Sequence, residues 1–200
     1  MAEVLVANTG LMGVETAEST FHTVLEIDPG NIEALNLLAQ ICAQTRRHKE
    51  AREFLACAVE SAGSEKDPEV AVELVKNLAE IYEGAHRFQL AAGIYELGLE
   101  RIDSAVFHHG IAYCYAKLGH YRKALSHSRR AVEMDPNNSV FVSDLGYTLL
   151  ETGDLHGAKS LFERAIELDP ANKLARGNLA HCVELMEQGR ADQDERSGRS

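Results

Sequence analysis

The chain has 200 residues, of which 45% are hydrophobic and 6% aromatic, and its formal net charge is −11. That negative charge would repel phosphate backbones, so nucleic acid is not an expected partner, and no apolar stretch approaches the roughly 18 residues that a membrane span needs. Few aromatic residues, no Trp and abundant Ala and Leu favour helices packed on helices. The first ten residues do not resemble a signal peptide, and the four cysteines, in separate predicted helices, suggest a reducing compartment. We therefore expect a soluble cytoplasmic protein.

Residues 3–31 are predicted to form the first helix pair, and it is the least regular one. Its first helix is short, and a turn is expected at the sequence GLMG, residues 10–13. Its second helix has apolar residues at helical spacing and ends before Pro29, because proline cannot continue a helix and restricts the residue before it.

Residues 32–64 and 71–104 are predicted to form the next two pairs, with apolar residues recurring at i, i+3, i+4 and i+7. Asn31 precedes the first of these helices, where an N-cap belongs. The polar sequence SAGSEKDPE, residues 61–69, separates the two pairs and is expected to be a loop.

Residues 105–138 and 139–172 are predicted to form two further pairs, each with a glycine at the turn between its helices, Gly119 and Gly153. Each of these pairs ends in Asp-Pro, which stops the second helix.

A single helix over 173–186 follows, and its polar positions are typical of a cap that covers the last pair of a stacked array. Ser139 and Asn172 are expected to be N-caps. The tail over 187–200 lacks apolar anchors and is expected to be disordered.

Small residues recur at three positions of these pairs. Their separations are 34, 40, 33 and 34 in the two series from the second helices, and 40, 33, 34 and 34 in the series from the first helices. Because one amphipathic pair cannot bury its own apolar face, the recurrence predicts a stack of pairs whose backbones approach closely. The three series are Ala17, Ala51, Ala91, Ala124 and Ala158; Val24, Ala58, Gly98, Ala131 and Ala165; and Ala39, Ala79, Ala112, Gly146 and Ala180.

This period, with its small packing residues, turn glycine and final proline, resembles the tetratricopeptide repeat, a helix–turn–helix unit of 34 residues. Two of the repeats depart from the family pattern, with Arg46 and His86 at the turn, and the usual Trp is absent throughout. The resemblance covers residues 3–186. It implies an all-α fold, a right-handed α-solenoid in which residues 1–186 form a single domain.

In this family the first helix of each pair lines a concave face, which implies a partner-binding groove. Its N-terminal half is predicted to be acidic and amide-rich, and its C-terminal half to hold apolar residues with Tyr113 and Tyr147. Tyrosine on a rigid helix gives a large contact area at low entropic cost, although both tyrosines could instead pack between adjacent helices. The predicted groove residues are Asn36, Gln40, Lys76, Glu80, Val106, His109, Tyr113, Val140, Ser143, Tyr147 and His181.

The resemblance implies an adaptor or scaffold that binds a peptide or helical segment of a protein partner, and the groove composition predicts a partner with apolar and basic parts. Two alternatives stay open. One is a homo-oligomeric scaffold in which the N-terminal unit, with Val4, Leu5 and Val6, inserts into a neighbour; the other is a regulatory subunit of an enzyme complex. The clamp with which some family members hold the C-terminal carboxylate of chaperones is not expected beside Glu73 and Glu80.

The sequence has no phosphate-binding loop, no dinucleotide-binding glycine pattern and no nucleophile elbow. Its nine histidines show no zinc-binding spacing. Cys114, near His108 and His109, falls on a predicted packing face, where a cysteine is inert. We therefore expect no enzyme activity, no metal and no cofactor.

Overall fold

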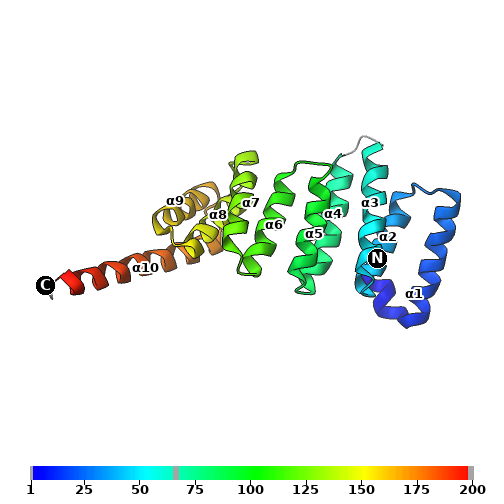
Figure 1. Cartoon of the computed structure of the whole chain (residues 1–200), viewed down its shortest axis with the longest axis horizontal. Helices are drawn as coiled ribbons and strands as arrows, with labels where there is room; N and C mark the ends of the chain where they lie inside the picture. Colours follow the sequence, from blue (N-terminus) through cyan, green and yellow to red (C-terminus); the bar gives the residue numbers. More distant parts are fainter. Residues whose placement is uncertain (1, 65–67, 198–200) are drawn as a thin grey trace. The chain divides into compact units, whose positions relative to one another are not determined.

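The computed structural model describes the backbone of residues 2–64 and 68–197 and the side chains of 13–63 and 68–189. Within these residues the chain forms ten α-helices and no β-strand, so the fold is all-α, as predicted (Figure 1). The helices are α1 Ala2–Ile27, α2 Ile32–Gln44, α3 His48–Ser64, α4 Pro68–Gly84, α5 Phe88–Leu99, α6 Ala105–Lys117, α7 Tyr121–Met134, α8 Ser139–Thr152, α9 Leu155–Leu168 and α10 Lys173–Ser197.

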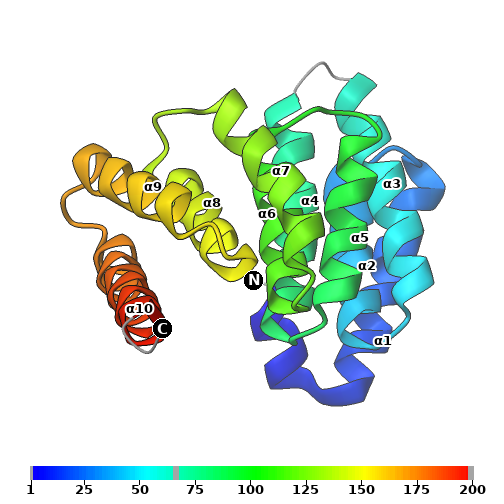
Figure 2. The same cartoon turned by 60° about the vertical axis from the view of Figure 1, so that its left-hand side comes forward.

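The chain divides into two compact units, Met1–Phe107 and His108–Ser200, with the boundary inside α6; the single domain over 1–186 remains a prediction. A stack of repeats divides readily in this way, because each repeat contacts only its neighbours. In the first unit α2 packs against α1, α3 and α4, and α5 packs against α4 and α3, so that the helices lie side by side (Figures 1 and 2). Leu38, Leu55, Leu78 and Val75 are fully buried between them.

In the second unit α8 packs against α7 and α9, and α10 packs against α9 and α8. Phe162 of α9 and Cys182 of α10 are buried in one apolar cluster with Leu149. Val142 and Ala175 are buried in a second cluster. The two neighbours of α9, the helices α8 and α10, therefore both pack against its apolar face.

Four turns between paired helices have the same backbone geometry. In each, the N–H of the turn residue donates to the carbonyl three residues back, and the next N–H donates to the carbonyl five residues back, which is a Schellman motif. The turn residues are 40, 33 and 34 positions apart, the spacing of the small residues, which confirms the register of the repeats. They are Arg46 (φ 65°), His86 (φ 54°), Gly119 (φ 73°) and Gly153 (φ 91°).

The small residues lie where the helices approach most closely. A Cβ atom at Gly98 would come within 2.6 Å of the Phe107 ring, and one at Gly146 within 2.8 Å of the Phe162 ring. The outermost members of the series are less enclosed: Ala17 and Val24 are half-buried and Ala180 is exposed. The buried members are Ala39, Ala51, Ala58, Ala79, Ala91, Gly98, Ala112, Ala124, Ala131, Gly146, Ala158 and Ala165.

Three predicted element boundaries differ from the structure. The first helix does not end at residues 10–13: α1 is helical from Ala2 to Ile27, although its ribbon bends near the N-terminal end (Figure 1). The two glycines there enclose Leu and Met, good helix formers, and no proline stops the helix. The predicted loop over 61–69 is shorter, because α3 continues to Ser64 and α4 begins at Pro68, a residue that the first turn of a helix tolerates.

The C-terminal helix is also longer than predicted. The sequence placed its end at residue 186 and a disordered tail over 187–200, but α10 continues to Ser197. Residues 187–197 consist largely of Glu, Gln, Arg and Ala, which favour helix, and contain no proline. Residues 198–200 lie outside the described part of the chain.

Helix caps agree with the sequence at two of three positions. The side chains of Asn31 and Asn172 each accept from the N–H three residues on, at 3.0 and 2.9 Å. The expected cap at Ser139 is wrong, because Asn138 caps α8. Ser139 instead donates to the main-chain carbonyl of Ala165 at 2.9 Å.

The four cysteines are free, and three of them are buried, among them Cys114 on its predicted packing face. Burial raises the pKa of the Cys42 thiol to about 11, which keeps it protonated and inert. Cys57 differs: it is exposed on α3. Among the described helices, none combines the length and apolar character that crossing a membrane requires.

Candidate functional site

A pocket of about 330 Å³ lies in the second unit, formed by side chains of α6, α7, α8 and α10. Four predicted groove residues line it: His109 and Tyr113 on α6, and Val140 and Tyr147 on α8. Residues spaced by three, four or seven along a helix share one face, which brings each of these pairs to the same side. Two adjacent first helices thus present their exposed faces to one cavity.

The rim of the pocket is apolar and open to solvent. Val140 is 53% exposed, Leu174 of α10 is 75% exposed and Tyr113 is 37% exposed. Two small residues of α6, Ala112 and Ala116, line the cavity with them. Large apolar side chains held in solvent around a concavity are typical of a binding surface.

A histidine–carboxylate pair forms part of one wall. His109 Nε2 lies 2.7 Å from Asp144 Oδ2, and the His109 ring stacks on Phe141 with centroids 4.7 Å apart. The main-chain carbonyl of Asp144 accepts from the Thr148 hydroxyl at 2.8 Å. These contacts fix the orientation of both side chains, and the Asp144 side chain is 42% exposed, so its carboxylate is the accessible negative charge of the pocket.

Two of the most buried residues that line the pocket are polar. Ser128 of α7 and Thr148 of α8 are 4% and 2% exposed, and their hydroxyl oxygens lie 3.4 Å apart. Because the Thr148 hydroxyl already donates to Asp144, Ser128 must be the donor between them. The Ser128 oxygen therefore offers acceptor capacity toward an occupant.

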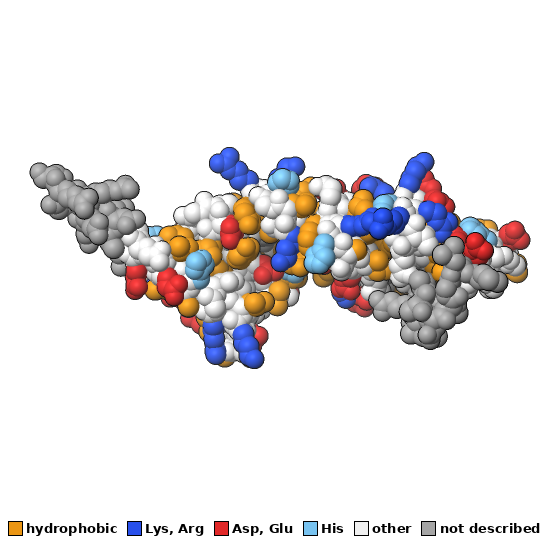
Figure 3. All heavy atoms as spheres, turned by 90° about the horizontal axis from the view of Figure 1, so that it is seen from below, with side chains coloured by type: hydrophobic (Ala, Val, Ile, Leu, Met, Phe, Trp, Pro, Cys, Tyr) orange, Lys and Arg blue, Asp and Glu red, His pale blue; other side chains and the backbone are white. Residues whose placement is uncertain are grey.

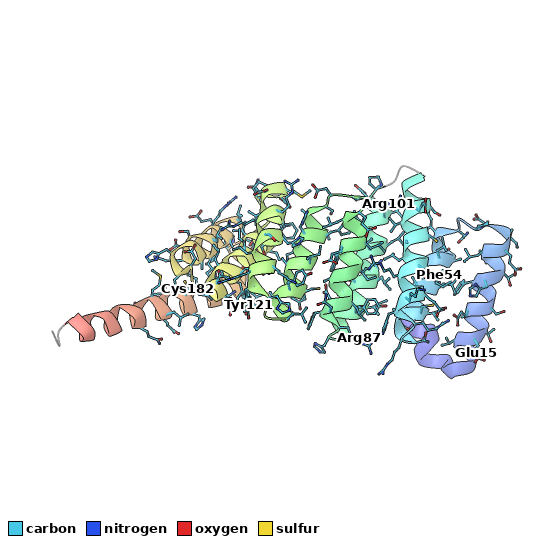
Figure 4. The ribbon with its side chains drawn as sticks, in the orientation of Figure 1. Glu15, Phe54, Arg87, Arg101, Tyr121 and Cys182 are labelled. Atoms are coloured by element: carbon cyan, nitrogen blue, oxygen red, sulfur yellow. The ribbon has the colours of Figure 1, made fainter. Side chains whose placement is uncertain are left out.

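The two tyrosines differ in how firmly they are held. Lys117 Nζ lies 5.1 Å from the centroid of the Tyr113 ring, a cation–π contact at the surface. Tyr147 meets Tyr121 edge to face, with centroids 6.4 Å apart (Tyr121 is labelled in Figure 4). Burial, followed by hydrogen bonds to Glu151 and Tyr121, raises the pKa of Tyr147. Tyr147 is therefore a packed wall of the pocket, whereas Tyr113 belongs to its open rim.

Two other predicted residues of this unit do not line the pocket. Ser143 is 3% exposed and belongs to the helix packing, which corrects its expected place on the groove surface. His181 is exposed on α10, and its Nδ1 lies 4.0 Å from Glu184 Oε2.

The remaining predicted residues lie on the first unit. Asn36 and Gln40 are half-buried on α2, and Asn36 Oδ1 has no hydrogen-bond partner among the described residues. Lys76 is half-buried and lies 3.3 Å from Glu73, and Glu80 is exposed. Val106, at the start of α6, is half-buried.

Sequence reasoning missed Asp144, Thr148, Ser128 and Lys117, which also line the pocket. Asp144 and Thr148 lie four and eight residues after Val140, so helical spacing could have found them. Ser128 comes from the second helix of its repeat, and no pattern within the first helices indicates it.

No group of three or more His, Cys, Asp or Glu side chains that could hold a metal ion occurs among the residues whose side chains are described. The imidazoles of His108 and His127 do meet, with their Nδ1 atoms 2.9 Å apart. At that distance one nitrogen donates and the other accepts.

Several solved structures share this fold. YrrB, described as a TPR protein with an unusual peptide-binding site, is 21% identical, with a TM-score of 0.61 over 84% of each chain. The second TPR domain of human RPAP3, solved with an HSP70 peptide, is 24% identical, with a TM-score of 0.52 over 55% of this chain and 92% of that one. The Sgt2 TPR domain from Aspergillus fumigatus is 20% identical, with a TM-score of 0.57 over 60% and 81%. At these identities the likeness concerns the fold alone.

None of the curated proteins compared with this sequence matches it. Two family models do match. The tetratricopeptide repeat model matches residues 14–71, and the model of YpiA-like, C-terminal tetratricopeptide repeats matches residues 106–172. Together they cover more than half of the chain, and the repeated turns and buried small residues agree with them. The chain belongs to the tetratricopeptide repeat family.

Proposed function

We propose that this protein is a non-catalytic adaptor, and that it holds a segment of a partner protein in the pocket between α6, α8 and α10. The observation that carries this proposal is the ring of exposed apolar side chains, Tyr113, Val140 and Leu174, around a cavity of about 330 Å³. That volume lies within the range of roughly 300–1,000 Å³ that is usual for binding pockets.

The lining of the pocket indicates what it would accept. Its apolar rim suits an apolar side chain, while the exposed carboxylate of Asp144 suits a basic group beside it. The Ser128 oxygen can accept from an N–H of the segment that reaches it. A segment with adjacent apolar and basic residues fits these features. The predicted partner-binding residues of the first unit, among them Lys76 and Glu80, do not line this pocket, and their role remains a prediction.

Structures that share the fold support a role in peptide binding. The human RPAP3 domain was solved with the HSP70 peptide SGPTIEEVD, and a domain of Spaghetti with the HSP90 peptide SRMEEVD. Both peptides are acidic at their C-termini. In this chain the pocket is lined by Asp144 and a single lysine, Lys117. We therefore propose that this protein also binds a peptide segment, but one with basic rather than acidic residues.

Matched variants test this proposal in a pull-down from native lysate, with quantitative mass spectrometry. The double variant Tyr113→Ala/Leu174→Ser removes two exposed rim side chains. The control Leu168→Ser removes an apolar side chain of α9 that is 38% exposed and does not line the pocket. We expect a protein that is recovered with the wild type and the control to be lost from the double variant. Equal recovery with all three, at unchanged helicity by circular dichroism, would contradict the proposal.

The two alternative functions, a homo-oligomeric scaffold and a regulatory subunit, are tested separately. Val4, Leu5 and Val6, on which the homo-oligomer hypothesis rests, lie outside the described side chains, so that hypothesis stays a prediction. Deleting residues 1–13 and measuring the mass by light scattering tests it, and an unchanged oligomer would contradict it. A regulatory subunit would instead recover an enzyme in the same pull-down. The free cysteines are compatible with the cytoplasmic location that we propose.

A further inference from the structure

Positive charge gathers on the first unit at the α2–α3 and α4–α5 turns, in a chain whose net charge is −11. We call Arg46, His48 and Arg87 at these turns the basic turn edge. The neighbouring cations are paired with carboxylates: Arg47 lies 2.5 Å from Glu18, and Lys49 lies 3.6 Å from Glu53. Among the described residues, neither Arg46 nor Arg87 has an ion pair.

The members of this edge are held together by contacts between helices. The Arg87 guanidinium donates to His48 Nε2, and His48 Nδ1 lies 3.2 Å from the hydroxyl of the buried Tyr82. Burial lowers the pKa of His48, and the charges of Arg87 and Arg46 lower it further, so the ring is neutral near pH 7. The charged groups that act on it are therefore both positive.

Backbone conformation gives a second, independent observation. Arg46 and His86 have φ angles of 65° and 54°, in the left-handed region that favours glycine, and the equivalent turns of the second unit use Gly119 and Gly153. A non-glycine residue kept in this conformation is disfavoured, and such residues are concentrated at functional sites. Both turns of the first unit thus carry a basic residue at a position where the backbone conformation favours glycine.

The figures show how this edge is presented. Figure 4 labels Arg87 at the lower end of α5 and Arg101 at its upper end. Figure 3 looks at the molecule from below, and Lys and Arg side chains are visible on that face among Asp and Glu side chains. Arg101, exposed at the opposite end of the same helix pair, therefore serves as a matched control.

We propose that the basic turn edge binds an acidic segment of a partner protein, rich in Asp and Glu. The planar guanidinium groups of Arg46 and Arg87 match carboxylates geometrically. A short acidic segment can cover this edge alone, whereas a long polyanion or an anionic membrane would also meet the acidic remainder of the surface. The site is separate from the pocket of α6, α8 and α10 and stands without it.

Fluorescence anisotropy with a fluorescein-labelled octaglutamate peptide tests the proposal on the full chain at low salt. We expect the wild type to bind despite its net charge, with an affinity that falls as salt is added. Arg46→Gly and Arg87→Gln should each weaken binding about three- to fivefold, the size of an exposed ion pair. Arg101→Gln should leave it unchanged.

Two further variants separate charge from folding. Arg46→Gly relieves the backbone conformation, so its loss of binding cannot come from unfolding. Arg87→Lys keeps the charge without the planar guanidinium, so it should restore only part of the affinity that Arg87→Gln loses. No binding of octaglutamate, or equal loss in Arg101→Gln and Arg46→Gly, would overturn the proposal. Binding to phosphatidylserine vesicles in place of the peptide would overturn it too.

Discussion

At four positions a single residue reverses the chain between paired helices, and the side chain that it carries differs between the two units. Gly119 and Gly153 adopt the left-handed conformation without a steric cost, whereas Arg46 and His86 adopt it against their preference. The hydrogen bonds of the four turns are the same. The tertiary packing of the repeats therefore imposes the turn, and the residue type only sets how much conformational energy it stores.

Replacing Arg46 with glycine should stabilise the protein. The left-handed conformation costs a non-glycine residue roughly 1–2 kcal/mol, and the greater freedom of glycine in the unfolded chain offsets about 0.5–1 kcal/mol of that. We expect Arg46→Gly to raise the free energy of unfolding by up to about 1 kcal/mol in urea denaturation. Gly153→Ala, the reverse change, should lower it by a similar amount. A lower midpoint for Arg46→Gly would contradict this explanation.

Adding one methyl group at Gly146 should destabilise the second unit. A Cβ atom there would lie 2.8 Å from the ring of Phe162, which is fully buried and cannot move aside. Overpacking of this kind costs about 1–3 kcal/mol. Gly177 in α10 is the control, because a Cβ there meets nothing within 4 Å, so Gly177→Ala should raise helix stability by up to about 1 kcal/mol. If both variants shift the urea midpoint alike, close packing at Gly146 is not the reason that it is glycine.

At the scale of elements, one short hydrogen-bonded chain joins three helices of the second unit. Asn172 caps α10, and its Nδ2 donates to Ser139 Oγ at 2.8 Å, at the start of α8. Ser139 Oγ donates in turn to the carbonyl of Ala165 in α9 at 2.9 Å. The cap of one repeat is thus tied to the repeat before it.

Removing the Asn172 side chain should therefore cost more than an isolated cap. Loss of the cap costs about 1 kcal/mol, and loss of the donor to Ser139 adds about 0.5–1.5 kcal/mol. We expect Asn172→Ala to lower the free energy of unfolding by both amounts together. Asn172→Asp should lose only the second, because a carboxylate can still cap the helix but cannot donate. An Asn172→Asp variant as stable as the wild type in urea denaturation would show that the link to Ser139 contributes nothing.

The helices inside the repeats could be predicted because two signals agree there, the 34-residue period and the apolar spacing. The boundaries that failed lie where only local stop signals were available. Gly10 and Gly13 suggested a turn, yet α1 runs through them; the tail looked disordered because it lacks apolar residues, yet it is composed of helix formers. At both places the helix preference of the residues, with no proline to stop the helix, outweighed these weak signals.

Four predicted groove residues line the pocket, but Asp144, Thr148 and Lys117 of the same first helices were missed, and so was Ser128 of a second helix. His109, Tyr113, Val140 and Tyr147 share predictable faces of α6 and α8. Ser128 reaches the pocket from a second helix, and only the packing of α7 on α8 brings it there. Such a contact depends on the arrangement of helices rather than on spacing along any one of them.

At the scale of the whole molecule, stability should fall in mild acid partly through His48. Burial, then the charges of Arg87 and Arg46, lower the pKa of this residue from its usual 6.5 in the folded state. Between the folded and the unfolded pKa of His48, the unfolded chain binds more protons than the folded chain. The contribution of His48 to the free energy of unfolding is therefore complete above pH 6.5 and is lost as the pH falls through the folded pKa. His48→Gln should flatten the dependence of the urea midpoint between about pH 7 and pH 5. His156→Gln, at an exposed position of α9, should leave it as steep as in the wild type.

Site-specific photo-crosslinking tests whether the pocket of α6, α8 and α10 holds a partner protein. A benzophenone amino acid in place of Tyr113 puts the reactive group at the rim of the pocket, and the same amino acid in place of Leu168 puts it outside. After irradiation of native lysate, we expect an adduct of one partner from position 113, the same protein that the Tyr113→Ala/Leu174→Ser variant loses, and none from position 168. An adduct from position 168 alone, or the same adducts from both, would contradict the claim.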